Sequence, residues 1–514
     1  MSHLKKFIIS STAPILISIS PILYLFAENF DRMSAIEIWI PICISIFIVF
    51  IVSGGLTLFS KNFEKAAIIT SFWIVYFYLF LPISKFLFKL DFVNNKGIAA
   101  GITFYLGTSA LLCFTFWCIS TRRKVDWIGS FLKVGSISLI LMVIISITNK
   151  SITTEMEISS IGPEIDLNQS NPKLKPDIYY ILLDGFGRFD VLNQMYGVST
   201  ENFNQKLKDL GFYVATDSKA NYIQTLLSLS STLNMDYLDK VTAKLPKDSK
   251  DRSLIRSLVR NSKVMNFLTS NGYTSYSFAS GYSGTDLIKT DQRVAAPYVF
   301  SEFHNLIFNV TPLPNLFRKL GLFKWQYDSH RKRLNFIFTE LPKIGEKITP
   351  KFVFAHIMAP HPPFVFDSKG QENFRKRNFA FDDGSHFKGK KREYLAGYRG
   401  QVTFLMNKIS NIVEEILKRD PDAIIILQGD HGPGSELNWS SVSQSNLWER
   451  TAILNAFRMG SNWPENLSMR SDISPVNTFR LILKEIFKLE IAELPDKSFY
   501  STWKKPYEFI EVEN

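Results

Sequence analysis

Apolar residues form five long segments before residue 150, whereas shorter apolar runs alternate with polar residues after it. The long segments are residues 7–26, 38–59, 66–84, 98–119 and 127–147. Each is close to the roughly 20 residues that a helix needs to cross the hydrocarbon core of a bilayer. Buried helices of soluble proteins are seldom so apolar. We therefore expect residues 1–149 to form a transmembrane domain of five helical spans.

The polar regions that flank these segments differ in charge, and this difference predicts their orientation. Three of them are basic and contain Lys5, Lys6, Lys61, Lys65, Arg122, Arg123 and Lys124. Regions rich in Lys and Arg stay on the cytoplasmic side of a membrane. Because the number of spans is odd, we expect a multi-pass protein of the cell (inner) membrane. The chain after residue 149 would then lie in the periplasm or outside the cell.

Residues 150–176 are polar and lack periodicity, which is typical of a linker, and residues 177–514 have the pattern of a folded domain. Strand-like apolar runs occur at 178–183, 273–279, 352–356 and 423–428. Helical spacing is found at 203–210, 264–268 and 402–416. This alternation predicts an α/β domain with a largely parallel central sheet covered by helices.

Charge and cysteine content narrow the chemistry of this domain. The three cysteines, Cys43, Cys113 and Cys118, all lie in the apolar segments, so neither a disulfide nor a thiolate metal site is expected after residue 149. Any metal must therefore use oxygen and nitrogen ligands. The net charge of +12 suits anionic lipid head groups, although a merely solvated basic surface explains it equally well. A nucleic acid partner is not expected on the outer side of a membrane.

Candidate ligands follow three of the predicted strands. Asp184 ends the first run, His356 and His361 lie at the end of the third, and Asp430 and His431 follow the fourth. Side chains at the carboxyl ends of parallel strands converge on one edge of the sheet, where ligands bind. An Asp after a strand is also a common turn residue, and a lone His is often a core residue. The adjacent Asp430 and His431, followed by Gly, are the more specific signal for metal binding.

A nucleophile, if the reaction is covalent, must be a hydroxyl group, because no cysteine is available. The candidates share one apolar stretch that favours a helix beginning near its first member; they are Thr225, Ser228, Ser230, Ser231 and Thr232. A helix N-terminus there would stabilise an alkoxide and an anionic phosphoryl group. The alternative is an ordinary Ser- and Thr-rich helix cap.

Taken together, Asp184, Thr225, the H-x4-H loop and the Asp-His-Gly motif resemble the sulfatase-like branch of the alkaline phosphatase superfamily. Five spans before such a domain resemble lipoteichoic acid synthases and lipid A phosphoethanolamine transferases within it. The resemblance implies one divalent cation, Mn, Zn, Mg or Ca, bound by Asp184, Thr225, Asp430 and His431. Thr225 would be the nucleophile, and Ser228, His356 and His361 would contact the substrate, with the two histidines acting in catalysis.

This resemblance predicts an enzyme that moves phosphoethanolamine or phosphoglycerol from a phospholipid to a cell-surface glycan or glycolipid through a phosphothreonine. The chain has no C-x-P-S-R motif for a formylglycine nucleophile, so a true sulfatase is disfavoured. Two alternatives remain: a hydrolase of phosphate or sulfate esters, and a non-catalytic membrane scaffold. Residues 311–351, which are rich in basic and aromatic side chains, are expected to pack near the membrane and shape the pocket.

Overall fold

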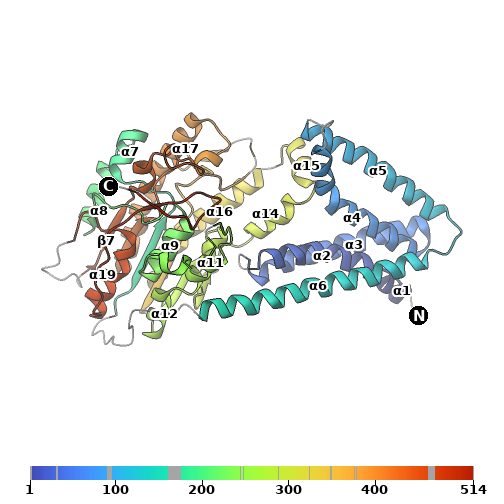
Figure 1. Cartoon of the computed structure of the whole chain (residues 1–514), viewed down its shortest axis with the longest axis horizontal. Coiled ribbons are helices and arrows are strands. Elements are labelled where there is room, and N and C mark those ends of the chain that lie inside the picture. Colours follow the sequence, from blue (N-terminus) through green and yellow to red (C-terminus); the bar gives the residue numbers. More distant parts are fainter. Residues whose placement is uncertain are drawn as a thin grey trace. The chain divides into compact units, whose positions relative to one another are not determined.

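The computed structural model describes most of the chain. The described residues are 3–30, 33–89, 95–159, 175–243, 245–246, 248–286, 289–322, 324–347, 350–374, 377, 379–460 and 469–512. They divide into two compact units (Figure 1). The apolar unit comprises Met1–Glu155 with Phe300–Phe323, and the α/β unit comprises Met156–Val299 with Lys324–Asn514.

Long helices make up most of the apolar unit, and five of those described are long and apolar enough to cross a membrane. These candidate spans are His3–Glu28, Ala35–Ser60, Phe63–Phe88, Gly97–Ser120 and Asp126–Asn149. The helices are α1 (His3–Ser10), α2 (Thr12–Glu28), η1 (Ala35–Ile38), α3 (Trp39–Ser60), α4 (Phe63–Phe88), α5 (Lys96–Ser120), α6 (Asp126–Ser159), α14 (Glu302–Asn309) and α15 (Leu313–Lys319). The prediction of five apolar N-terminal helices is confirmed.

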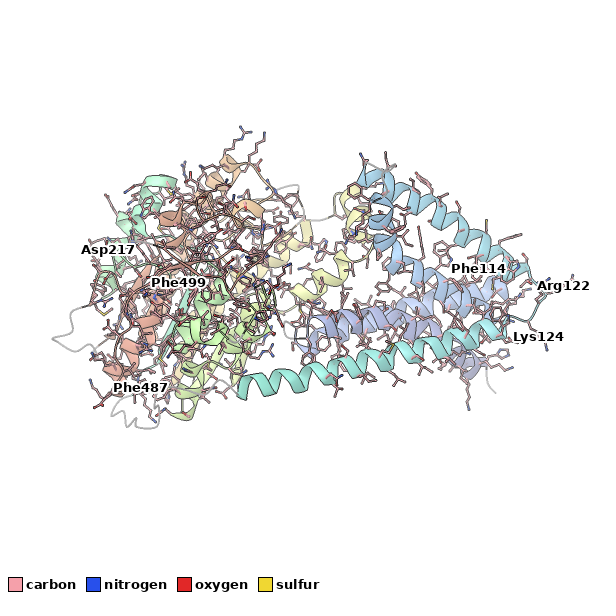
Figure 2. All side chains as sticks on the ribbon, in the orientation of Figure 1. Phe114, Arg122, Lys124, Asp217, Phe487 and Phe499 are labelled. Atoms are coloured by element: carbon pink, nitrogen blue, oxygen red, sulfur yellow. The ribbon has the colours of Figure 1, made fainter. Side chains whose placement is uncertain are left out.

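The basic links of the apolar unit lie at one end of its helices. Lys65 Nζ donates to the carbonyl oxygens of Ile119 (3.1 Å) and Thr121 (2.7 Å), which joins the second basic link to the third. Arg122 and Lys124 lie where α5 leads into α6 (Figure 2). One end of the helices therefore carries the charges expected on the cytoplasmic side.

A seven-stranded sheet organises the α/β unit, with strand order β2-β7-β6-β1-β5-β3-β4. β7 pairs antiparallel with β2 and β6, and the other described strand pairs of this sheet are parallel. The strands are β1 (Ile178–Leu183), β2 (Tyr213–Val214), β3 (Thr274–Phe278), β4 (Gln292–Val294), β5 (Lys351–Ile357), β6 (Ile424–Gly429) and β7 (Asn455–Arg458). A separate ribbon pairs β8 (Phe499–Tyr500) with β9 (Ile510–Glu511). The largely parallel sheet confirms the predicted fold class.

Helices cover both faces of this sheet, because its central strands are apolar on both sides. Along β1, Tyr179, Ile181 and Leu183 pack into one core, and the alternate residues pack into the other. The first core is covered by α7 (Phe189–Tyr196), α8 (Glu201–Asp209), α16 (Lys324–Glu340), η2 (Leu341–Glu346) and α17 (Lys391–Arg419). The second is covered by α9 (Thr225–Asn234), α11 (Ser253–Arg260), α12 (Lys263–Ser270) and α19 (Pro475–Phe487).

The remaining described helices are short, and two local features differ from the sequence-based expectation. The short helices are α10 (Asp239–Thr242), α13 (Ser283–Asp286), η3 (Gly384–His386) and α18 (Leu447–Thr451). The helix α6 continues to Ser159, into the segment expected to be a linker; residues 160–174 of that segment lie outside the described residues. Residues 300–323, expected within the catalytic domain, group with the apolar helices.

Candidate functional site

Three neighbouring strands bring the predicted ligands to one edge of the sheet. β1 lies between β5 and β6, and Leu183 at its end pairs with Ile357 on one side and Gly429 on the other. Asp184 therefore emerges beside Asp430 and His431, which follow β6. His356 lies within β5, opposite Leu182, and His361 follows four residues after the strand ends. The parallel order of these strands places all five side chains at their carboxyl ends.

Asp184, Asp430 and His431 form the cluster that could hold a metal ion: one ligand atom from each lies within 4.8 Å of the others, and all three residues are buried. Two carboxylate oxygens in this cluster, Asp184 Oδ1 and Asp430 Oδ2, are buried without a hydrogen-bond partner in the described chain. Buried carboxylate oxygens rarely stay unpaired, because their desolvation is costly. The donor set therefore fits a divalent cation with oxygen and nitrogen ligands.

The ring of His431 is oriented so that one nitrogen could bind a cation. Its Nδ1 lies 3.0 Å from the carbonyl oxygen of Gly432, which can only accept, so Nδ1 carries the proton and Nε2 offers its lone pair. Nε2 lies 3.2 Å from Asp430 Oδ2 and 3.8 Å from Asp184 Oδ1. Burial, together with the nearby Arg450 guanidinium, lowers the pKa of His431 and favours this neutral ring.

Thr225 differs from the other candidate nucleophiles in exposure and in its partners. It is the first residue of α9, is half-buried, and places Oγ1 3.1 Å from His431 Nε2. The other four hydroxyl groups are fully buried and donate to backbone carbonyls, those of Asp430, Ile255, Asp236 and Ser228. Thr225 is therefore the one of the five that combines access with proximity to the ligand cluster.

Ser228 lies beneath the cluster. Its hydroxyl donates to the carbonyl oxygen of Asp430 at 2.7 Å, and 1% of the residue is exposed. This bond fixes the backbone of a candidate ligand to α9. The geometry favours a supporting role for Ser228 over the predicted contact with substrate.

His356 is also buried, and both of its ring nitrogens have partners. Nε2 lies 3.1 Å from Asp184 Oδ2, and Nδ1 lies 2.8 Å from the hydroxyl of Thr285. A histidine that holds a carboxylate ligand in this way sets the direction of its other oxygen. The structure thus places His356 behind Asp184, where it orients that side chain.

His361 is the histidine that reaches the cluster from the loop. Its Nδ1 lies 2.5 Å from the carbonyl oxygen of Pro362, which leaves the Nε2 lone pair for other groups, and its ring centre is 6.3 Å from that of His431. Burial alone would raise the pKa of Asp184, but His361, His356 and His431 together hold that pKa below its usual value. Asp184 is therefore ionised at neutral pH.

Two glycines let these loops approach one another. Gly185 has a φ of +74°, in the left-handed region, and its N–H donates to Asp430 Oδ1 at 3.0 Å. A Cβ at Gly432 would lie 2.1 Å from the carbonyl oxygen of Glu449, so a side chain there would force the loop apart. These positions explain the Gly residues that follow Asp184 and His431 in the sequence.

Sequence reasoning missed a second buried pair beside the cluster, Asp383 and Arg450. Arg450 Nη1 donates to Asp383 Oδ2 at 2.6 Å and to the Gly432 carbonyl at 3.0 Å, while Nε donates to the carbonyl of Ile223. Asp383 Oδ2 lies 3.9 Å from His361 Nε2. Arg450 therefore joins the loop after His431, the segment before Thr225 and the loop that contains Asp383. No local motif marked either residue.

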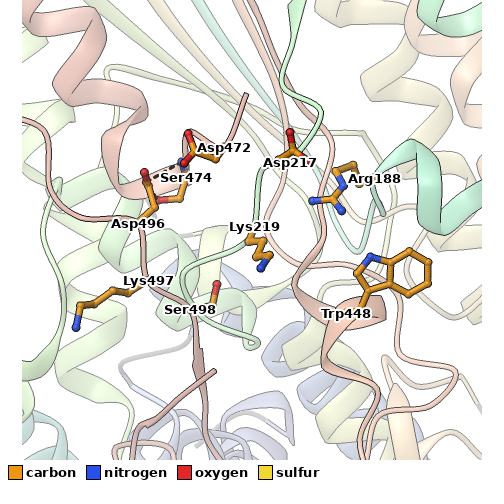
Figure 3. A pocket seen from close by; sticks show the side chains of 9 residues that line it. All are labelled: Arg188, Asp217, Lys219, Trp448, Asp472, Ser474, Asp496, Lys497 and Ser498. Atoms are coloured by element: carbon orange, nitrogen blue, oxygen red, sulfur yellow. Dashed lines mark hydrogen bonds between the residues drawn. The ribbon is translucent and has the colours of Figure 1, made fainter. Parts of the chain in front are cut away.

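A polar cavity of about 410 Å³ lies elsewhere in the α/β unit. Figure 3 shows its lining, which is Arg188, Asp217, Lys219, Trp448, Asp472, Ser474, Asp496, Lys497 and Ser498. None of the predicted ligands or nucleophiles lines it. Several of its charged groups already pair within the chain, including Arg188 with Asp190 and Lys497 with Glu511. The chemistry is thus assigned to the cluster at the strand ends and not to this cavity.

Comparison with solved structures gives three examples of similar chains. The C-terminal periplasmic domain of EcEptC from Escherichia coli, in complex with Zn, has 12% identity and a TM-score of 0.43, covering 68% of this chain and 96% of that one. The integral membrane lipooligosaccharide phosphoethanolamine transferase A (EptA) from Neisseria meningitidis has 11% identity and a TM-score of 0.40, covering 93% and 95%. A phosphonate monoester hydrolase of Agrobacterium radiobacter has 14% identity and a TM-score of 0.41, covering 63% and 80%.

Comparison by sequence identifies the family. No curated protein sequence matched the chain. The model of the sulfatase family matches residues 176–455, which is more than half of the chain and spans every predicted ligand. This match confirms the resemblance to the sulfatase-like branch. The chain belongs to the sulfatase family, and it is an enzyme of the alkaline phosphatase superfamily.

Proposed function

We propose that this enzyme is a membrane-anchored phosphotransferase that moves phosphoethanolamine or phosphoglycerol from a phospholipid to a cell-surface glycan or glycolipid. One observation carries the proposal: Thr225 is the accessible hydroxyl of its segment and lies 3.1 Å from His431 Nε2, beside two unpaired carboxylate oxygens. A serine or threonine nucleophile suits transfer through a covalent phosphoryl-enzyme. Five apolar helices would hold the site at the leaflet where a phospholipid donor is concentrated.

The first step is displacement at phosphorus. The Thr225 oxygen bonds to phosphorus, the bond to the diacylglycerol oxygen breaks, and that oxygen takes a proton as the lipid leaves. In the second step an acceptor hydroxyl loses its proton and attacks the phosphothreonine, which restores the Thr225 hydroxyl. Protons are thus conserved across the two steps. His361 is placed to carry them, because its Nε2 is directed away from the Pro362 carbonyl.

Asp184, Thr225, Asp430 and His431 would hold the divalent cation. When bound, it would lower the proton affinity of the Thr225 hydroxyl and offset negative charge on the transferred group. The N-terminus of α9 adds backbone N–H groups next to Thr225, and these favour an anion at the same place. The chain itself therefore supplies a nucleophile and a site for its charged substrate.

Intact-mass analysis of the full-length protein tests the proposal. The protein is incubated with Mn²⁺ and phospholipid vesicles, and any adduct is mapped, with Thr225→Ala and Ser228→Ala as matched variants. We expect an adduct of phosphoethanolamine or phosphoglycerol size on Thr225, absent in Thr225→Ala and present in Ser228→Ala. An adduct on another hydroxyl would overturn the choice of nucleophile. Metal-dependent cleavage of a soluble phosphate or sulfate ester without any adduct would favour a hydrolase instead.

The location of the enzyme follows from the same proposal. The basic links at one end of the apolar helices favour a cytoplasmic position for that end, and with an odd number of spans the α/β unit would then lie in the periplasm or outside the cell. Protease added to intact spheroplasts should then cleave the α/β unit. Resistance of that unit in spheroplasts, with cleavage after lysis, would contradict this topology.

A further inference from the structure

One segment of the chain belongs to the apolar unit although it lies between two elements of the α/β unit in sequence. Residues Phe300–Phe323 follow β4 and precede α16, and they contain α14 and α15. The chain therefore passes between the two units three times: after Glu155, before Phe300 and after Phe323. A linker after the last span would need only one passage. The second and third passages therefore need a physical explanation, which the contacts of residues 300–323 provide.

α14 is fixed to the end of the first candidate span. Phe303 is completely buried and packs edge-on against Phe26 with ring centres 6.2 Å apart, in a cluster that includes Ile22 and Met33. Phe26 lies in the last turn of α2, where the apolar span gives way to a polar link. The segment is thus anchored at the level where a span leaves the hydrocarbon core.

α15 folds back on α14 and leaves one apolar face uncovered. Phe308 and Phe317 pack edge-on with ring centres 5.1 Å apart, which fixes the two helices to each other. Leu316 in α15 is 49% exposed, and Leu320 and Leu322, which follow the helix, are 59% and 52% exposed. Arg318 and Lys319 lie between these leucines in the sequence.

The exposure of these leucines matches the candidate spans and not the α/β unit. Side chains of the apolar helices reach similar values, such as 68% for Leu106 and 51% for Leu139. In the described part of the α/β unit, the large apolar side chains that are exposed are Tyr298, Trp503 and Ile510, and none is a leucine. The surface of α15 therefore has the composition of a lipid-facing surface. Leucines alternating with basic residues are typical of segments that lie in the plane of a membrane interface.

We propose that residues 300–323 form an interfacial segment that docks on the outer leaflet of the bilayer. Leu316, Leu320 and Leu322 would enter the boundary between head groups and acyl chains, and the positive charge of the Arg318-Lys319 pair in the sequence would attract anionic phospholipids. Lys324, the next basic residue, is already paired with Glu372 at 2.8 Å and is not part of this set. The proposal does not depend on the reaction that the enzyme catalyses.

Depth-dependent fluorescence of the full-length protein in proteoliposomes tests the docking. In a background without Cys43, Cys113 and Cys118, single cysteines replace Leu316 or Leu320 and carry an environment-sensitive dye. A matched cysteine at Asn411, an exposed position on α17, serves as the aqueous control. We expect blue-shifted emission at both leucine positions and at least twofold stronger quenching by head-group-proximal spin-labelled lipid than at Asn411. Emission and quenching equal to those at Asn411 would overturn the proposal.

Two further outcomes separate lipid from other occupants of this face. Blue-shifted emission without lipid quenching would show that protein covers the leucines, and it would overturn docking on lipid. The double variant Arg318→Glu with Lys319→Glu should reduce quenching in vesicles that contain phosphatidylglycerol but not in vesicles of phosphatidylcholine alone. Equal quenching of the double variant and its parent in both vesicles would overturn the role assigned to the basic residues. None of these readouts requires catalytic activity.

Discussion

The two ends of the central sheet use buried charges in opposite ways. At the amino ends of β1 and β5, Asp177 forms an ion pair with Lys351 Nζ and also accepts the Lys351 backbone N–H at 2.9 Å. At the carboxyl ends of the same strands, Asp184 lies 3.1 Å from His356, and its second oxygen has no partner in the described chain. The first acid is satisfied by the chain, whereas the second is not.

This difference separates stability from function within one pair of strands. A buried acid whose partner is a lysine needs nothing from outside, and breaking such a pair leaves an uncompensated charge. A buried acid with an unpaired oxygen is costly for the fold and persists where a ligand completes it. We therefore expect variants at the carboxyl end to lose activity and variants at the amino end to lose stability.

The largest effect is expected for Asp430→Asn at the carboxyl end. Losing one charged ligand should reduce activity on any phosphoryl substrate about 1000-fold, because charge stabilisation at the reacting group is lost. Added divalent cation should stabilise the wild type by about 2.7 kcal/mol at a concentration 100 times its Kd, and this gain should disappear in the variant. A turnover assay measures the loss of activity, and thermal unfolding with and without metal measures the loss of stabilisation.

The matched control for this prediction is Asp217→Asn. This variant makes the same replacement of Asp by Asn as Asp430→Asn does. Asp217 is exposed and lines the separate polar cavity. We expect its activity to stay within about twofold of the wild type and its metal-dependent stabilisation to be unchanged. Loss of activity in Asp217→Asn would mean that the cavity takes part in catalysis and would weaken the distinction between the two sites.

The next effect is expected for Lys351→Met at the amino end. The variant should lose about 3–5 kcal/mol of unfolding free energy, since Asp177 is left buried without its partner. Activity per folded molecule and the stabilisation by metal should remain close to the wild type. The surface variant Lys343→Met, which breaks an exposed pair with Glu340, should cost no more than about 1 kcal/mol. A metal-binding defect in Lys351→Met would contradict the separation of the two ends.

The sequence predicts the functional part of this sheet better than its edges. β1, β5 and β6 are apolar runs of six or seven residues, and they fall where their patterns predict strands. β2, β4 and β7 have two to four residues and were not predicted, because such short runs have no measurable periodicity. Their pairing is decided by the neighbouring strands and not by local preference.

The candidate site also contains residues that the sequence predicts and residues that it does not. Asp184, Asp430 and His431 could be chosen from the sequence because each directly follows a buried strand, and the structure brings them together with Thr225. The residues that orient these ligands could not be chosen from the sequence. Thr285, Asp383 and Arg450 lie in loops or short helices that are far from the ligands in the chain. Residues 311–351 were expected to pack near the membrane, but the bounds of the segment that groups with the apolar helices, residues 300–323, could not be predicted, because they depend on tertiary packing around Phe303.

A smaller effect is expected for Arg450→Lys, which tests how the carboxyl end is held together. A lysine cannot donate at once to Asp383, Gly432 and Ile223, because it lacks the planar fork of a guanidinium. We expect a loss of 10- to 100-fold in kcat, the usual range when the partner of a ligand loop is lost. Metal affinity should change less than kcat, since Arg450 contacts no ligand atom of the cluster. A larger loss of metal affinity than of kcat would contradict this reading.

The smallest effect concerns Asp420, the second acid at the amino end of the sheet. Burial is the main cause that raises the pKa of Asp420 to about 6, and a hydrogen bond and charge repulsion from Asp177 add to it. The folded state therefore holds this proton more tightly than the unfolded chain does. Folding stability should fall as the pH rises from about 4 to about 6 and should stay reduced above that range.

Asp420→Asn removes this titration and keeps the size of the side chain. Because Asp420 is only half-buried, we expect the variant to be more stable than the wild type by only about 1 kcal/mol at pH 7.5. At pH 4 the two proteins should unfold at the same temperature, since the wild-type acid is then protonated in the folded state. Comparing metal-free thermal unfolding at both pH values isolates this effect, because the ligand cluster contributes equally to both proteins. A stability difference that does not change with pH would show that Asp420 stays ionised beside Asp177, and that the acids at this end are satisfied by Lys351 alone.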